Sequence, residues 1–94
     1  MAFIRIVRPP SVDARRYDLV GDRLRMASDP PLGLISHAAG DRDGQWQIVE
    51  VWESEEYARR FDDERLTPTL ESVIGEPPPS SPMESYELHE LITP

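Results

Sequence analysis

Clusters of proline and glycine divide the chain into short segments, and their spacing limits the fold more than any other feature. The sequence has 10 Pro and 5 Gly among 94 residues. The breaks fall at 9–10, 29–31, 40–44 and 75–82. Proline lacks a backbone donor and has a fixed φ, so helices and central strands end at such positions. We therefore expect short elements in a single domain, 1–94, because a chain of this length is too short for two ordinary cores.

The apolar pattern between the breaks predicts the order β-α-β-β-α-β. Strands are expected at 3–7, 34–39, 45–52 and 83–92, helices at 12–26 and 55–73, and a five-residue hairpin turn at 40–44. The strand segments are short and apolar or alternate in polarity, and the second helix carries apolar residues three to five positions apart. This order is that of the ferredoxin-like fold, of the α+β class, with a four-stranded antiparallel sheet.

Local signals predict where the helices begin and end. Ser11 and Ser54 are placed to cap the two helices, and Asp13 adds negative charge to the first turn of the first one. Pro68 predicts a kink in the second helix, or a new helix that begins near Thr67.

The last strand and the bare face of the sheet predict self-association. The Pro-rich segment 75–82 is expected to be extended, reaching roughly 25 Å at about 3.1 Å per residue, so the last strand could pair on another subunit. With both helices on one face of the sheet, its other face is left uncovered. A bare apolar sheet face on a small domain predicts a homodimer in which sheet packs against sheet.

Composition narrows the classes of function. The absence of Cys excludes disulfides, thiol nucleophiles and Cys-ligated metal sites, and the absence of Lys excludes Schiff-base chemistry. The 18 acidic and 10 basic residues give a net charge of −8, so nucleic acid and anionic membranes are not expected partners. The acidic runs 55–56 and 62–64 are expected to be solvated helix faces. No apolar stretch has the length of a signal or membrane-spanning segment, so we expect a cytoplasmic protein. All basic residues are Arg, which together with the proline content favours a bacterial source.

Ionisable residues on the expected strands are candidates for chemistry. His37 is a candidate general base toward a phenol or an acidic C–H; the alternatives are a place in the dimer interface or a structural histidine. Arg5 lies among apolar residues, where it would bind a ligand anion or pair with Glu50 or Glu87. Glu50 is either that partner or an acid–base group with a shifted pKa.

Aromatic residues and the second histidine complete the candidate ligand contacts. Trp52, at the end of the third strand, would line a pocket and donate from its indole N–H, or would fill the core. His89 is a general base or a structural residue, and because no third ligand lies at metal spacing, no metal site is expected. The other candidates for substrate contact are Trp46, on the face of Glu50 and Trp52, and Tyr57, Phe61 and Tyr86, for which packing is the alternative.

Two stretches carry a family resemblance. One is Val51-Trp52-Glu53-Ser54-Glu55-Glu56, which leads into the second helix and on to Leu66-Thr67-Pro68; the other is Pro31-Leu32-Gly33-Leu34-Ile35-Ser36-His37. Together they resemble small antibiotic biosynthesis monooxygenase-like proteins of the dimeric α+β barrel superfamily. The resemblance implies a homodimer with a pocket between each sheet and its own helices. Some members of this group are cofactor-free oxygenases of polycyclic phenols or anthrones, others degrade haem, and others are isomerases.

The resemblance also implies particular site residues. The oxygenases and haem degraders use an Asn with a strand-end Trp, and the haem degraders add an iron-ligating His on the second helix. Trp52 matches the Trp, but the chain has no Asn, and the stretch 59–65 of the second helix has no His. Haem degradation is therefore not expected.

Two hypotheses of function follow, neither of which requires a cofactor. The first is a small cofactor-independent monooxygenase-like protein, or a related isomerase or cyclase, acting on an aromatic or polyketide-like molecule. His37 would be the base, and Arg5 or Trp52 would stabilise the substrate anion. The second is a non-catalytic dimeric ligand-binding or assembly protein with the same fold.

Overall fold

The computed structural model describes residues 1–75 and 81–94, and its elements follow the predicted order. They are β1 (Phe3–Val7), α1 (Ala14–Leu24), β2 (Leu34–Arg42), β3 (Gln45–Trp52), α2 (Glu55–Phe61), the π-helical turn η1 (Asp62–Leu66), α3 (Thr67–Ile74) and β4 (Met83–Glu87). The expected extended connector 75–82 lies largely outside the described residues. No helix among those described is long and apolar enough to span a membrane.

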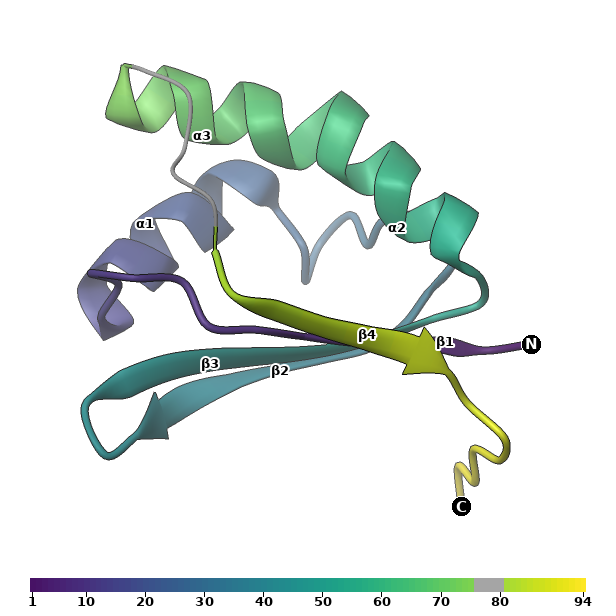
Figure 1. The fold of residues 1–94 in the computed structure, drawn as a ribbon. Helices are drawn as coiled ribbons and strands as arrows, with labels where there is room; N and C mark the ends of the chain where they lie inside the picture. The colour runs from purple at the N-terminus through teal and green to yellow at the C-terminus, as the bar shows by residue number, and fades with distance from the viewer. Residues whose placement is uncertain (76–80) are drawn as a thin grey trace.

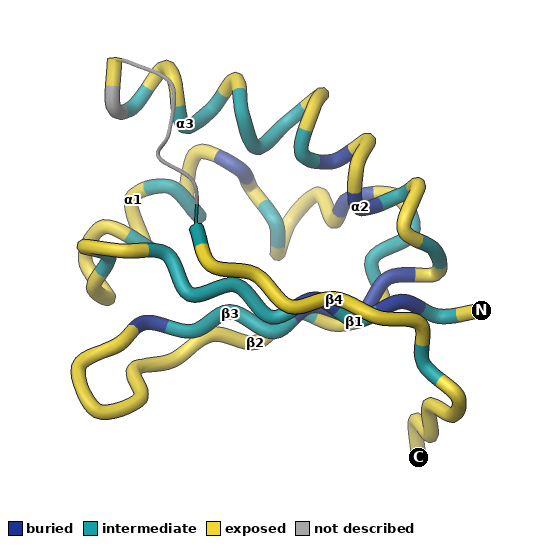
Figure 2. The backbone as a smooth tube through the Cα atoms, in the orientation of Figure 1, coloured by how far each residue is buried: buried dark blue, intermediate teal, exposed yellow. Residues whose placement is uncertain are grey.

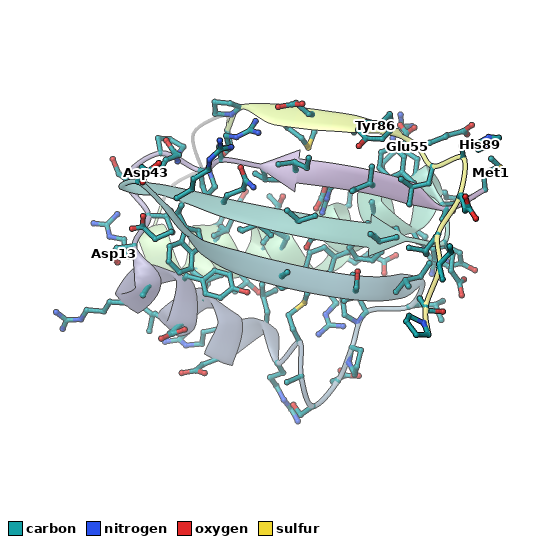
Figure 3. The ribbon with its side chains drawn as sticks, turned by 90° about the horizontal axis from the view of Figure 1, so that it is seen from below. Met1, Asp13, Asp43, Glu55, Tyr86 and His89 are labelled. Atoms are coloured by element: carbon teal, nitrogen blue, oxygen red, sulfur yellow. The ribbon has the colours of Figure 1, made fainter. Side chains whose placement is uncertain are left out.

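The four strands form one antiparallel sheet in the order β2-β3-β1-β4. All the helices lie on one face of this sheet (Figure 1), and the opposite face is open to view in Figure 3. The α+β ferredoxin-like prediction is therefore confirmed. In this chain β4 pairs with its own β1 rather than with another subunit, and it ends at Glu87 instead of 92. The last pairing bond runs from Leu88 N–H to the carbonyl of Ala2, where the partner strand reaches the start of the chain.

The face toward the helices alternates as the sequence predicts for β3. Trp46, Glu50 and Trp52 of this face are buried and Ile48 is half-buried, while Val51 of the opposite face is buried as well. A cluster of buried residues, Phe3, Leu24, Trp52, Ala58 and Phe61, forms the apolar core. In Figure 2 the buried segments gather where β1 and β3 lie under α2 and the end of α1. The core is small, so the burial of charged residues beside it has a large effect on the energetics.

The first helix begins later than predicted. Its N-cap is Asp13, whose side chain accepts a hydrogen bond of 2.9 Å from the backbone N–H of Arg16. The prediction of Ser11 as the cap is wrong, because Ser11 has a φ of 57°, in the left-handed region, and lies before the helix. The helix ends at Leu24, since Arg25 also adopts a left-handed conformation, with a φ of 57°.

In the β2–β3 hairpin, β2 extends further and the turn is shorter than expected. Its turn is formed by Asp43 and Gly44 alone, with φ of 52° and 87°, as a two-residue turn with two left-handed positions requires. An irregularity between Leu34 and Ser36 shifts the register, so that Leu34 lies opposite Trp52 and His37 lies opposite Glu50. This bulge turns His37 toward the helices.

The second helical segment changes character twice. Ser54 occupies the N-cap position of α2, as predicted, but its side chain makes no capping hydrogen bond. The π-helical turn η1 follows α2, and α3 begins at Thr67 with Pro68 in its first turn, which is the second of the two predicted outcomes.

Candidate functional site

Two charged residues, Arg5 and Glu50, are buried side by side on the inner face of the sheet. They are 6% and 4% exposed and lie opposite each other on β1 and β3. Arg5 Nε donates to Glu50 Oε1 at 2.7 Å. This is one of the two ion pairs expected for Arg5. A buried charge is tolerated only when it is paired and hydrogen-bonded, and both conditions are met here.

Helical and strand residues complete the partners of this pair. The two terminal nitrogens of Arg5 donate to both carboxylate oxygens of Asp62 at 2.6 and 2.7 Å. The indole N–H of Trp52 donates to Glu50 Oε1 at 3.3 Å. All three guanidinium nitrogens of Arg5 therefore have carboxylate acceptors within the protein.

His37 extends the arrangement across a third strand. Its Nδ1 lies 2.9 Å from Glu50 Oε2, and its Nε2 is hydrogen-bonded to the hydroxyl of Tyr17 on α1. An ionised Glu50 can only accept, so Nδ1 carries the proton, and in the neutral ring Nε2 then accepts from the Tyr17 O–H. Tyr17, His37, Glu50, Arg5 and Asp62 form one continuous polar network.

The pKa values within the network follow from its partners. Burial raises the pKa of Glu50, but the hydrogen bonds and positive charges of His37 and Arg5 outweigh burial and lower it below its ordinary value. Burial lowers the pKa of Arg5, and the hydrogen bonds and charges of Asp62 and Glu50 outweigh it, so that the net shift is upward. Burial, followed by the charges of Glu50 and Asp18, raises the pKa of Tyr17. Glu50 is therefore a carboxylate, Arg5 a cation and Tyr17 a neutral phenol near pH 7.

Aromatic rings pack together at the end of the network that reaches α1. The Tyr17 and His37 rings are nearly parallel, with centroids 5.9 Å apart and an interplanar angle of 18°, and they meet through the Tyr17 hydroxyl. The Tyr17 ring also lies 5.2 Å from the ring of Trp46. Trp46 is 8% exposed, and its indole N–H has no hydrogen-bond partner within the described part of the chain. A buried donor without an acceptor is costly and uncommon in native structures.

Trp52, in contrast, is a core residue in this structure. It has no exposed surface, its ring packs 5.3 Å from that of Phe61, and Arg5 lies over it at 5.6 Å. Tyr57 of α2 packs over Gly33. The structure thus brings Phe61 to the core and leaves no space against the ring of Trp52 for a ligand.

Two hollows lie elsewhere on the helical side. One, of about 380 Å³, lies between α1 and α3 and is lined by Arg23, Leu24, Glu64, Arg65, Pro68, Thr69 and Ser72. The other, of about 40 Å³, is lined by Pro31, Leu32, Tyr57, Arg60, Phe61, Glu64 and Arg65. Neither includes a residue of the polar network, although the second includes the candidates Tyr57 and Phe61.

The two candidates near the end of the chain lie outside the network. Tyr86 is 53% exposed on β4, and His89 is exposed beyond the end of that strand. Figure 3 shows both at the end of the sheet where Met1 lies. In residues 1–75 and 81–94 no group of three or more His, Asp or Glu side chains is placed to hold a metal ion.

Two residues of the network, Tyr17 and Asp62, were missing from the sequence-based candidates. Asp62 belongs to the acidic run 62–64, which was expected to face solvent. It lies four positions after Ala58 and directly after Phe61, both buried, and this spacing could have placed it on the inner face. Tyr17 has a weaker signal, because only its position beside the apolar stripe of the first helix points inward.

Comparisons with known proteins agree on the fold. No family model and no curated protein matches the sequence. Among solved structures, a protein from Chloroflexus aurantiacus assigned as an antibiotic biosynthesis monooxygenase superposes with a TM-score of 0.68 at 12% identity, with 99% of this chain and 98% of that one covered. SnoaB, a cofactor-independent oxygenase from Streptomyces nogalater, gives 0.60 at 14% identity, with 97% and 94% covered. The haem degrader MhuD from Mycobacterium tuberculosis gives 0.55 at 12% identity, with 98% of each chain covered.

Proposed function

We propose that this chain, which has the ferredoxin-like fold of antibiotic biosynthesis monooxygenase-like proteins, is a small cofactor-independent oxygenase that uses His37 as a general base. The observation that carries the proposal is the position of His37 between a carboxylate and a phenol. Glu50 accepts a hydrogen bond from Nδ1, and Nε2 accepts one from the Tyr17 hydroxyl. A ring nitrogen that already accepts from one phenol is suited to accept a proton from a phenolic or anthrone-type substrate.

The reaction needs no electron carrier if the substrate anion is rich in electrons. For an anthrone, His37 Nε2 takes a proton from the acidic CH2 group. The carbanion gives one electron to O2, and the two radicals combine to form a C–O bond. The resulting peroxide takes the proton back from His37 and loses water, with loss of the second C–H, so that anthrone and O2 give anthraquinone and water.

The other members of the network act by positioning. Glu50 fixes the orientation of the imidazole and stabilises the cation formed when His37 accepts a proton. Arg5 and the Trp52 N–H both donate to Glu50, so they hold the carboxylate in place rather than contact a substrate anion. We therefore assign the substrate-facing end of the proposed site to His37 and Trp46, near α1, instead of to Trp52.

We also propose that the functional unit is a homodimer in which the open faces of the sheets pack together. The strand register places Ile4 and Ile6 of β1 and Val49 of β3, all half-buried, on the face opposite the buried Arg5 and Glu50. No helix covers this face in the described part of the chain. Exposed apolar residues of β4 and the tail, including Tyr86 and Ile92, extend the apolar surface that a second copy would bury.

A specific observation favours a second candidate, a non-catalytic dimeric ligand-binding or assembly protein. Trp52 has no exposed surface, and neither of the two hollows reaches His37. A protein of this kind would keep the polar network to hold its helices on the sheet, and His37 would transfer no proton.

Oxygen consumption distinguishes the two candidates. Anthrone is mixed with the wild-type protein, with His37→Gln, and with His89→Gln, which alters the second histidine of the chain outside the network. The oxygenase proposal predicts that the wild type and His89→Gln consume oxygen faster than buffer does. In His37→Gln the enzymatic rate of oxygen consumption should fall about a hundredfold or more. A wild-type rate equal to that of buffer would support the non-catalytic candidate.

A further inference from the structure

The Tyr17 side chain has the contacts expected of a bound phenol. Its hydroxyl is hydrogen-bonded to Nε2 of His37, the atom proposed to accept the substrate proton, and its ring lies within 18° of the plane of the imidazole. The ring also lies against Trp46, at a centroid distance of 5.2 Å and an interplanar angle of 43°. Two aromatic neighbours and one acceptor for a hydroxyl are what a planar phenol requires of a binding site.

The neighbouring Trp46 carries an unused donor. Its side chain is more than nine-tenths buried, and its indole N–H has no partner in the described residues. Tyr17 presents a ring rather than an acceptor to Trp46. A ligand with a carbonyl or second hydroxyl oxygen would provide the missing acceptor and would remove the cost of the unpaired donor.

The helix that carries Tyr17 is held mainly at its other end. Within α1, all of which is described, Leu24 in the last turn is the one buried residue. Tyr17 is half-buried in the first turn, and its near neighbours Asp18 and Leu19 are exposed. Movement of the Tyr17 side chain therefore uncovers mainly its own ring and the ring of Trp46, which a planar ligand in the same place would cover again.

We infer that Tyr17 occupies the ligand site from within, and that a planar phenol with a second oxygen binds by displacing the Tyr17 ring, with its hydroxyl on His37 and its other oxygen on the Trp46 indole N–H. This inference rests on the proposed function, since it assigns the ligand class and the gating residue of the same site. It also accounts for why neither of the two hollows described above reaches His37, since the side chain of Tyr17 lies against that residue.

The test compares wild type with Tyr17→Phe, which removes the hydroxyl and keeps the ring, so that it creates no cavity. The probe is 1,8-dihydroxyanthraquinone, a planar phenol with a carbonyl oxygen, and anthraquinone is the control ligand without hydroxyls. Binding is followed by calorimetry, and the two indole N–H signals are followed by NMR, with Trp46→Phe used to assign them. Tyr57→Phe removes a phenolic hydroxyl elsewhere and serves as the matched protein control.

Displacement predicts that Tyr17→Phe binds the probe about fivefold more tightly than wild type, because one hydrogen bond no longer holds the ring in place. Tyr57→Phe keeps the wild-type affinity, the Trp46 indole signal shifts on binding, and anthraquinone shows no such gain. Equal or weaker binding by Tyr17→Phe, with oxygen consumption still dependent on His37, overturns the inference and leaves the proposed function standing. Binding of the probe by neither protein contradicts both.

Discussion

The Arg5 guanidinium donates two hydrogen bonds, of 2.6 and 2.7 Å, to the two carboxylate oxygens of Asp62. This contact joins β1 to the first residue of η1, 57 positions along the chain. The third nitrogen of Arg5 binds Glu50, which in turn binds His37. The position of the proposed base thus depends on an ion pair that also fixes the second helical segment on the sheet.

Asp62→Asn should therefore destabilise the protein by about 2–3 kcal/mol, because a buried guanidinium loses charged acceptors. Asp63→Asn is the matched control, since Asp63 is the exposed neighbour in the same acidic run. Its effect should be within about 0.5 kcal/mol. Chemical denaturation measures both free energies of unfolding. Equal effects of the two substitutions would mean that the Arg5–Asp62 contact adds no stability.

Glu50 should make stability depend on acid. Its pKa is lower in the folded state, so its contribution is present above the unfolded-state pKa, about 4.3, and is lost as the pH falls through the folded value. Glu50→Gln should cost about 3 kcal/mol at pH 7. The gap to wild type should narrow steadily below about pH 4. Unfolding free energies measured from pH 7 to pH 2 check this, with Glu53→Gln, at an exposed site, as the control. A gap that stays constant with pH would contradict the assignment.

Gly33 should tolerate no side chain. It has a φ of 86°, and a Cβ added there would lie 2.3 Å from Cγ of Tyr57. Gly44 has nearly the same φ, 87°, with open space around it. Gly44→Ala should cost about 1 kcal/mol from backbone strain, and Gly33→Ala about 1–3 kcal/mol more from the clash. Thermal unfolding of both variants gives the difference; equal losses would show that Tyr57 moves aside freely.

The open face of the sheet should hold the dimer together. Val49→Arg places a charge at the middle of this face, and Ser72→Arg makes the same charge change on exposed α3. Light scattering should give twice 10.7 kDa for the wild type and Ser72→Arg, and a single chain mass for Val49→Arg. A dimer that survives Val49→Arg would place the interface elsewhere.

Strand alternation predicts much of the inner face, but not its register. The period of two along β3 correctly groups Trp46 with Glu50 and Trp52. The facing of His37 depends on the bulge between Leu34 and Ser36, which adds one residue to β2. A single inserted residue has no distinct signature in a short apolar run. The face of the sheet on which His37 lies could therefore be determined only from the structure.

The two network residues that come from helical segments were harder to predict, for a different physical reason. Tyr17 and Asp62 meet the sheet residues because of the rotation and placement of their helices over the sheet, which tertiary packing determines. The one local sign that Asp62 turns inward is its spacing from Ala58 and Phe61, and the acidic run 62–64 itself gives none. The requirement that a buried Arg5 be fully paired is a physical clue to Asp62, but it does not select one carboxylate among 18 acidic residues.

Proton abstraction in the absence of oxygen tests the central claim, that His37 acts as a base, most directly. The exchange of the anthrone CH2 protons with deuterium is followed anaerobically by NMR, which separates the base from every later step. The account predicts about a hundredfold faster exchange with wild type and His89→Gln than with buffer, and a rate near that of buffer with His37→Gln. Exchange by His37→Gln at the wild-type rate, or no acceleration by the wild type, would contradict it.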